Sequence, residues 1–129
     1  MLAALGRLVD AGIPLENQAV LLAGVNDRRD RIERLSRALL RARVRPYYLH
    51  QCDPVTGTEH FRVPLATGME IVEGLLGQVA GLAIPRYVVD APGGHGKVRL
   101  TADNRIGREG AATLLRAPDG TTVRYPDPA

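Results

Sequence analysis

The sequence is poor in aromatic residues and in cysteine. Only 4% of its 129 residues are aromatic, with one Phe and no Trp, so a core must be built mainly from Leu, Val, Ile and Ala. The single cysteine, Cys52, can form neither a disulfide within the chain nor, alone, a cysteine-based zinc or iron–sulfur site. No apolar run reaches transmembrane length, and residues 1–9 are too short for a signal peptide. We therefore expect a cytoplasmic protein without membrane contact.

The rest of the composition is typical of a globular domain. Hydrophobic residues make up 45% of the chain and charged residues 24%, which fits one aliphatic core of the α/β class. The formal charge is +3, and arginines concentrate in residues 28–45. An RNA-binding surface is one interpretation of this stretch. Apolar residues at helical spacing and the lack of stacking aromatics favour a solvated helix face, so we expect no nucleic-acid partner.

Helical and strand patterns alternate along the first ninety residues. A helix is expected over residues 2–9 and a buried strand over 19–22. Asn26 and Asp27 offer an N-cap to a second helix. Its expected apolar face comprises Ile32, Leu35, Leu39 and Leu40.

A second strand is expected over residues 44–49, where Pro46 indicates an early position or a sheet edge. Thr67 should cap a third helix that ends near Gly81, and residues 87–89 should form a third strand. This order is typical of a parallel α/β sheet, but three strand–helix units do not close a barrel. We divide the chain into a partial (β/α) barrel over 1–90 and a C-terminal extension over 91–129. The extension should hold a hairpin with strands 112–116 and 122–125.

A glycine-rich turn with a lysine, ending at Lys97, is the first candidate for chemistry. It is not a P-loop, because Ala91 and Val98 stand where that motif requires Gly and Ser or Thr. A lysine held by such a turn can form a Schiff base with pyridoxal phosphate. Taken alone, however, the pattern is more often a solvent-exposed turn.

Two aspartates follow predicted strands, Asp53 and Asp90. Because the carboxyl ends of parallel strands face the binding crevice, these carboxylates could hold an ammonium group there. Loop hydrogen bonding is the alternative for each. His50, at a strand end, is a candidate cofactor neighbour, with a structural role equally open. The spacing of His50, His60 and His95 matches no common zinc pattern, so no metal site is predicted in this chain.

Four segments in order and with compatible spacing resemble the lysine 2,3-aminomutase family. They are residues 13–27, 44–53, 57–62 and 88–97, and they include Asn17-Gln18, Pro46-Tyr47-Tyr48-Leu49, Gln51-Cys52-Asp53 and Asp90-Ala91-Pro92-Gly93-Gly94-x-Gly96-Lys97. The resemblance implies an open, partial (β/α) barrel. It also implies a radical S-adenosylmethionine enzyme that uses pyridoxal phosphate to move an amino group between adjacent carbons of an amino acid.

The resemblance also implies residue roles. Lys97 matches the Schiff-base lysine, Asp53 and Asp90 match the two carboxylates that hold the side-chain ammonium of lysine, and Gln18 lies on the S-adenosylmethionine side. His50 stands where lysine mutases often carry Tyr. The Cys-x-x-x-Cys-x-x-Cys motif for the 4Fe–4S cluster is absent.

The absent cluster motif limits what this chain is expected to do. We expect the C-terminal part of such an aminomutase, inactive by itself and a homo-oligomer when complete. The alternative is a stand-alone, non-enzymatic α/β module that binds pyridoxal phosphate, a basic small molecule or an anionic partner such as RNA.

Overall fold

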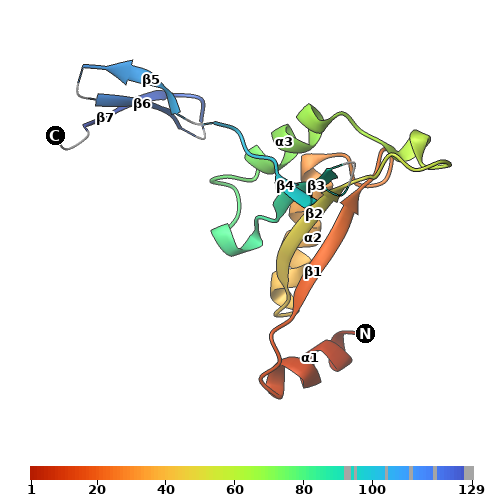
Figure 1. The fold of residues 1–129 in the computed structure, drawn as a ribbon. Helices are drawn as coiled ribbons and strands as arrows, with labels where there is room; N and C mark the ends of the chain where they lie inside the picture. The colour runs from red at the N-terminus through yellow and green to blue at the C-terminus, as the bar shows by residue number, and fades with distance from the viewer. Residues whose placement is uncertain (92–93, 95, 104, 111, 118, 127–129) are drawn as a thin grey trace.

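The first sheet carries all the strands expected before residue 90. In the computed structural model, which describes every residue except 92–93, 95, 104, 111, 118 and 127–129, the strand order is β1-β2-β3-β4 (Figure 1). The parallel strands are β1 (Glu16–Leu21), β2 (Arg45–Gln51) and β3 (Arg86–Ala91). The fourth strand, β4 (Gly96–Arg99), pairs antiparallel with β3. The predicted parallel α/β order is thus confirmed for three strands.

Two helices link these strands and cover one face of the sheet, α2 (Arg29–Arg41) and α3 (Leu65–Glu73). A further helix, α1 (Leu2–Asp10), precedes β1, and short 3₁₀ turns lie at Glu59–Phe61 and Gly81–Ala83. Figure 1 shows α2 behind β1 and β2. Helix α1 buries none of its residues, whereas α2 buries Ile32 and α3 buries Ile71. No helix in the described part of the chain is long and apolar enough to cross a membrane.

The core lies between the sheet and helices α2 and α3. Alternate residues of each strand point into the core. Tyr87 is its largest fully buried side chain, and the other core residues are mainly aliphatic. The Tyr87 hydroxyl donates to the side-chain amide oxygen Oε1 of Gln51, and Gln51 Nε2 donates to the backbone carbonyl of Val63 at 2.8 Å. The buried polar groups of Tyr87 and Gln51 therefore have hydrogen-bond partners. The buried cluster consists of Leu21, Ile32, Leu49, Val63, Ile71, Leu75 and Tyr87.

An extra residue in β2 interrupts its pairing with β1. Asn17 pairs with Pro46, but Gln18 pairs with Tyr48, so Tyr47 has no partner on β1. Such a bulge fits the proline, which has no backbone N–H for a ladder hydrogen bond. The rings of Tyr47 and Tyr48 lie 3.9 Å apart, and the Tyr47 hydroxyl donates to that of Tyr48 at 3.0 Å. Pro46 is early in its strand, as predicted. It is not at an edge, since β2 lies between β1 and β3.

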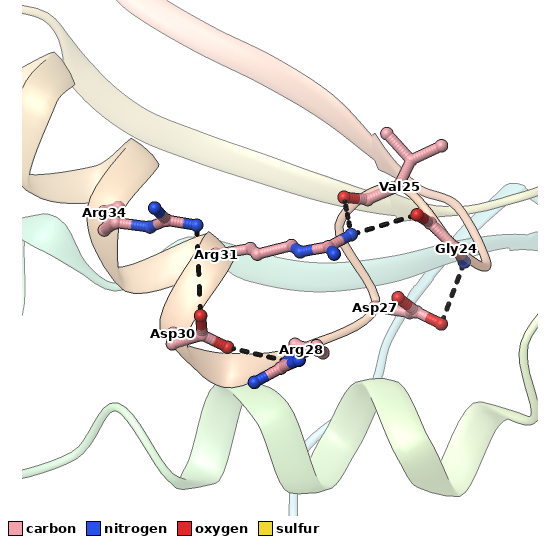
Figure 2. Close-up of polar contacts among 7 residues, drawn as sticks. All are labelled: Gly24, Val25, Asp27, Arg28, Asp30, Arg31 and Arg34. Carbon is pink, nitrogen blue, oxygen red and sulfur yellow. Dashed lines mark hydrogen bonds and ion pairs between the residues drawn. The ribbon is translucent and has the colours of Figure 1, made fainter.

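The loop between β1 and α2 differs from its prediction. Neither Asn26 nor Asp27 caps α2, whose N-cap is Arg28. Asn26 instead accepts from the Leu22 N–H at 2.7 Å, and Asp27 accepts from the Gly24 N–H at 3.0 Å. Figure 2 shows this loop, in which the Arg31 guanidinium also donates to two loop carbonyls, those of Gly24 and Val25. Backbone groups in this loop have no partners in a β-ladder, and these side chains supply hydrogen bonds to them instead.

Helix α3 is shorter than predicted. It begins after Pro64, so Thr67 lies in its first turn and does not cap it, and it ends at Glu73 where Gly81 had been expected. Leu75 is nevertheless completely buried. The apolar spacing that suggested a longer helix therefore continues through turns that pack on the same core.

A second sheet follows β4. It has the order β5-β6-β7, with β5 (Arg105–Glu109), β6 (Ala112–Arg116) and β7 (Thr122–Pro126), all antiparallel. Figure 1 shows it set apart from the first sheet. The predicted hairpin is confirmed as β6 and β7, while β5 had not been predicted. The described residues form a mixed α/β structure with two sheets and no closed barrel.

Candidate functional site

The face of the first sheet opposite the helices, here called the open face, carries a row of polar side chains. Gln18 comes from β1, His50 from β2, Asp90 from β3 and Lys97 from β4. Asp90 pairs with Lys97, whereas Gln18 pairs with Tyr48 and His50 pairs with Val20 and Val88. The four residues share one side of the sheet because a shift of two positions along a strand keeps the side. Four of the five residues predicted to form a site therefore lie together on one surface.

Asp90 and Lys97 form the tightest contact of the row. They face each other directly across β3 and β4, and Lys97 Nζ donates to Asp90 Oδ1 at 2.6 Å. The Lys97 hydrogen bond holds the pKa of the Asp90 carboxyl below its usual value, and the charges of Lys97 and His50 act in the same direction against partial desolvation. Asp90 is thus a carboxylate at neutral pH, with 49% of its side chain exposed.

His50 connects the two ends of the row. Its Nε2 lies 2.9 Å from Gln18 Oε1, and its Nδ1 lies 3.8 Å from the second carboxylate oxygen of Asp90. The side chain is only 18% exposed, and its ring meets that of Tyr48 edge-on. His50 is therefore fixed in orientation between Gln18 and Asp90.

Lys97 is placed where a cofactor aldehyde could reach it. Its side chain is 35% exposed, and its Nζ lies 5.7 Å from the centre of the Tyr48 ring. Lys97 is also the only lysine in the chain, among sixteen arginines. A guanidinium cannot take the place of a primary amine in imine formation. The amine, the neighbouring carboxylate and the adjacent ring fit an aromatic aldehyde cofactor such as pyridoxal phosphate.

The prediction that Lys97 lies in a turn is wrong. It is the second residue of β4, and the glycine-rich segment joins two antiparallel strands. Gly94 and Gly96 both have positive φ, of 77° and 84°, which only glycine adopts readily. Pro92, Gly93 and His95 of that segment lie outside the described residues.

Asp53 does not join the row. It lies in the exposed loop after β2, and within the described part of the chain its carboxylate has neither a hydrogen bond nor an ion pair. Its backbone carbonyl accepts from the Thr58 hydroxyl at 2.9 Å. The two aspartates that the resemblance pairs are thus not brought into contact by this structure.

Tyr48 belongs to the site and had not been singled out. Its ring lies between His50 and Lys97. Its presence in the Pro-Tyr-Tyr-Leu segment was visible, but simple alternation does not show that both tyrosines lie on the open face. The bulge at Tyr47 is the cause, and it depends on pairing with β1.

Sequence comparisons relate the chain to known proteins. A protein-family model described as lysine-2,3-aminomutase matches residues 72–129. The chain is 46% identical over 122 residues to L-lysine 2,3-aminomutase of Bacillus subtilis, covering 95% of this chain and 26% of that protein. It is 49% identical over 121 residues to L-lysine 2,3-aminomutase of Acetoanaerobium sticklandii, covering 94% and 29%. Glutamate 2,3-aminomutase of Clostridioides difficile is 40% identical over 121 residues, with coverage of 94% and 29%.

These relatives are named as amino acid 2,3-aminomutases, which are isomerases. The chain belongs to the lysine 2,3-aminomutase family and corresponds to the C-terminal part of its members. The resemblance based on the four sequence segments is therefore confirmed. The chain spans between about a quarter and a third of the length of these relatives.

Proposed function

We propose that this chain supplies the part of an aminomutase that binds pyridoxal phosphate and the amino acid substrate. The observation that carries the proposal is the contact between Lys97, the only lysine, and Asp90 on the open face, with His50 and Tyr48 beside them. When bound, the cofactor would supply an electron sink for the reacting amino group. The chain's residues would anchor, orient and charge-match the two molecules.

Each residue of the row has a distinct role in this proposal. The Lys97 amine holds the cofactor covalently, and Tyr48 presents its ring beside that amine. Asp90, held as a carboxylate, attracts an ammonium group of the substrate. His50, fixed by Gln18, borders the carboxylate on the side away from Lys97. Asp53 would become a second carboxylate for the same ammonium only in a conformation that brings its loop toward the row.

A cationic side chain is the substrate feature that this charge favours. The relatives include both lysine and glutamate aminomutases. A glutamate side chain would meet the carboxylate of Asp90 with like charge, whereas the ammonium of lysine would be attracted. We therefore propose a diamino acid such as L-lysine as the substrate.

The radical half of the reaction belongs to residues beyond those of this chain. A 4Fe–4S cluster needs several cysteine ligands, and this sequence has only Cys52, which is buried. Gln18, on β1, would lie toward S-adenosylmethionine in a complete (β/α) barrel. We propose that the chain acts together with a cluster-bearing barrel part, as a cytoplasmic homo-oligomeric enzyme.

Trapping of the cofactor on Lys97 tests the proposal. The protein is mixed with equimolar pyridoxal phosphate, reduced with borohydride and analysed by peptide mass spectrometry. We expect one adduct on Lys97, with the Met1 α-amino group as an internal reference for unspecific labelling. Lys97→Arg, which keeps the charge but lacks a primary amine, should leave only that background. Equal labelling of Met1 and Lys97 in the folded protein would contradict the proposal.

A further inference from the structure

Asp90 already holds an ammonium group, namely that of its own chain. Lys97 Nζ contacts Oδ1 at 2.6 Å, while His50 Nδ1 lies 3.8 Å from Oδ2. The ammonium of an amino acid that approaches Asp90 therefore meets a carboxylate oxygen that already accepts a hydrogen bond from Lys97. The Lys97 side chain is the same as that of free L-lysine, the proposed substrate, and ends in a primary ammonium on a four-carbon stem.

The backbone builds this contact in. Asp90 and Lys97 form a directly opposed pair of the antiparallel β3–β4 ladder, so their Cα atoms are held by the strand register. The Lys97 ammonium is thus tethered next to the carboxylate, whereas a free amino acid must reach it from solution. A tether of this kind gives the internal group a high effective concentration.

We infer that Lys97 occupies the substrate-ammonium position at Asp90 until its amine is committed to the cofactor, so that a basic amino acid binds less tightly before cofactor attachment than after it. This inference rests on the proposed function, because it takes Asp90 as the ammonium site and Lys97 as the anchor. It adds an order of binding, with cofactor first and substrate second.

The chemistry of attachment agrees with this order. To condense with an aldehyde, the Lys97 ammonium must leave Asp90 and lose one proton to solvent. One C=N bond then forms, one water is released, and nothing is oxidised or reduced. The carboxylate is left without its short contact, and the remaining neighbour, His50, is 3.8 Å away. The position is then open to a second ammonium.

The experiment needs no cofactor, so it fails or succeeds independently of the trapping test. Binding of L-lysine to the chain and to Lys97→Met is followed by NMR, with L-norleucine as the ligand that lacks the side-chain ammonium. We expect L-lysine to bind Lys97→Met roughly two- to fivefold more tightly, the range for displacement of an exposed ion pair. L-norleucine should bind both proteins equally, and the double variant Lys97→Met/Asp90→Asn should lose the gain.

Several results would overturn the inference. These are equal affinity for L-lysine in the chain and Lys97→Met, a gain that survives loss of the Asp90 charge, an equal gain for L-norleucine, or no measurable binding of L-lysine to Lys97→Met. A second measurement guards against a folding defect. In folded Lys97→Met, the pKa of the Asp90 carboxyl should rise toward its ordinary value, because the hydrogen bond that lowers it is gone. Failure of the borohydride trapping alone would count against the proposed function only.

Discussion

The two faces of the first sheet are made by the same four strands and have opposite characters. On the helix-covered face, Leu21, Leu49 and Tyr87 are almost completely buried. On the open face, the polar residues Gln18, His50 and Asp90 are exposed or half-buried, and they share that face with Val20 and with the buried Val88. Burial of aliphatic surface stabilises the first face, at about 25 cal/mol per Å² removed from water. The second face adds little stability and keeps its polar groups accessible to ligands.

Substitution of Gly68 should have the largest effect of those considered, and it acts on the covered face. A Cβ at this position in α3 would overlap the Tyr87 ring, which is itself fully buried. We expect Gly68→Ala to reduce the free energy of unfolding by about 3 kcal/mol, as for severe overpacking. Urea denaturation measures it.

The matched control is Gly81→Ala. A Cβ there meets nothing within 4 Å, and the backbone is not in the left-handed region. Its free energy of unfolding should change by less than about 0.5 kcal/mol. If Gly68→Ala were as mild as this control, the packing of α3 against Tyr87 would not exist as described.

Removal of the Tyr87 hydroxyl should have a smaller effect on the same face. Tyr87→Phe leaves the buried Gln51 carbonyl oxygen without its donor, which costs about 1–3 kcal/mol at neutral pH. Thermal denaturation at pH 7 measures the loss. A variant as stable as the parent would show that Gln51 finds another donor.

The same tyrosine predicts a dependence on alkaline pH. Burial raises the pKa of Tyr87 to about 12, against an ordinary value of 10.0 in the unfolded chain. The unfolded state therefore releases its proton first, and stability should fall as pH rises from about 10 to about 12. Tyr87→Phe should reduce this slope. Urea midpoints measured across that range compare the two proteins.

The smallest effect on stability is expected on the open face. The pKa of the Asp90 carboxyl is lowered, chiefly by the Lys97 hydrogen bond, so its stabilising contribution is present above the ordinary carboxyl pKa and is lost as pH falls through the lowered value. Asp90→Asn should flatten the acid limb slightly and leave stability at pH 7 close to that of the parent. A change as large as that of Gly68→Ala would mean that this face is structural.

The parts of the fold that follow local rules could be predicted from the sequence. The alternation of strands and helices, the strand positions and the β6–β7 hairpin all have local signals. Strand β4 was missed because all four residues of Gly96–Arg99 are exposed and lack the apolar alternation of a half-buried strand. The end of α3 was missed because apolar spacing continues into turns that bury Leu75.

The sequence predicts a set of site residues but not their geometry. Lys97 was singled out by its glycine-rich turn, Asp90 and His50 by strand ends and Gln18 by the resemblance, yet the contact between Lys97 and Asp90 depends on the antiparallel pairing of β4. The N-cap assigned to Asn26 and Asp27 failed for a related reason. The same side chains can satisfy a loop backbone as readily as a helix start, and only the tertiary path of the loop decides between them.

The unpaired Tyr47 decides which side chains of β2 are available for chemistry. With an unbroken register from the Asn17–Pro46 pair, Leu49 would lie beside Val20 on the open face, and His50 would lie beside Leu21 in the core. The bulge leaves Tyr47 out of the ladder, so Leu49 pairs with Ala19 on the core side and His50 pairs with Val20 on the open face. Because Tyr47 lies outside the ladder, its deletion would keep the pairs Gln18–Tyr48 and Val20–His50, and the imidazole would stay in the polar row. Only straightening of the bulge with Tyr47 retained would put the isobutyl group of Leu49 in its place.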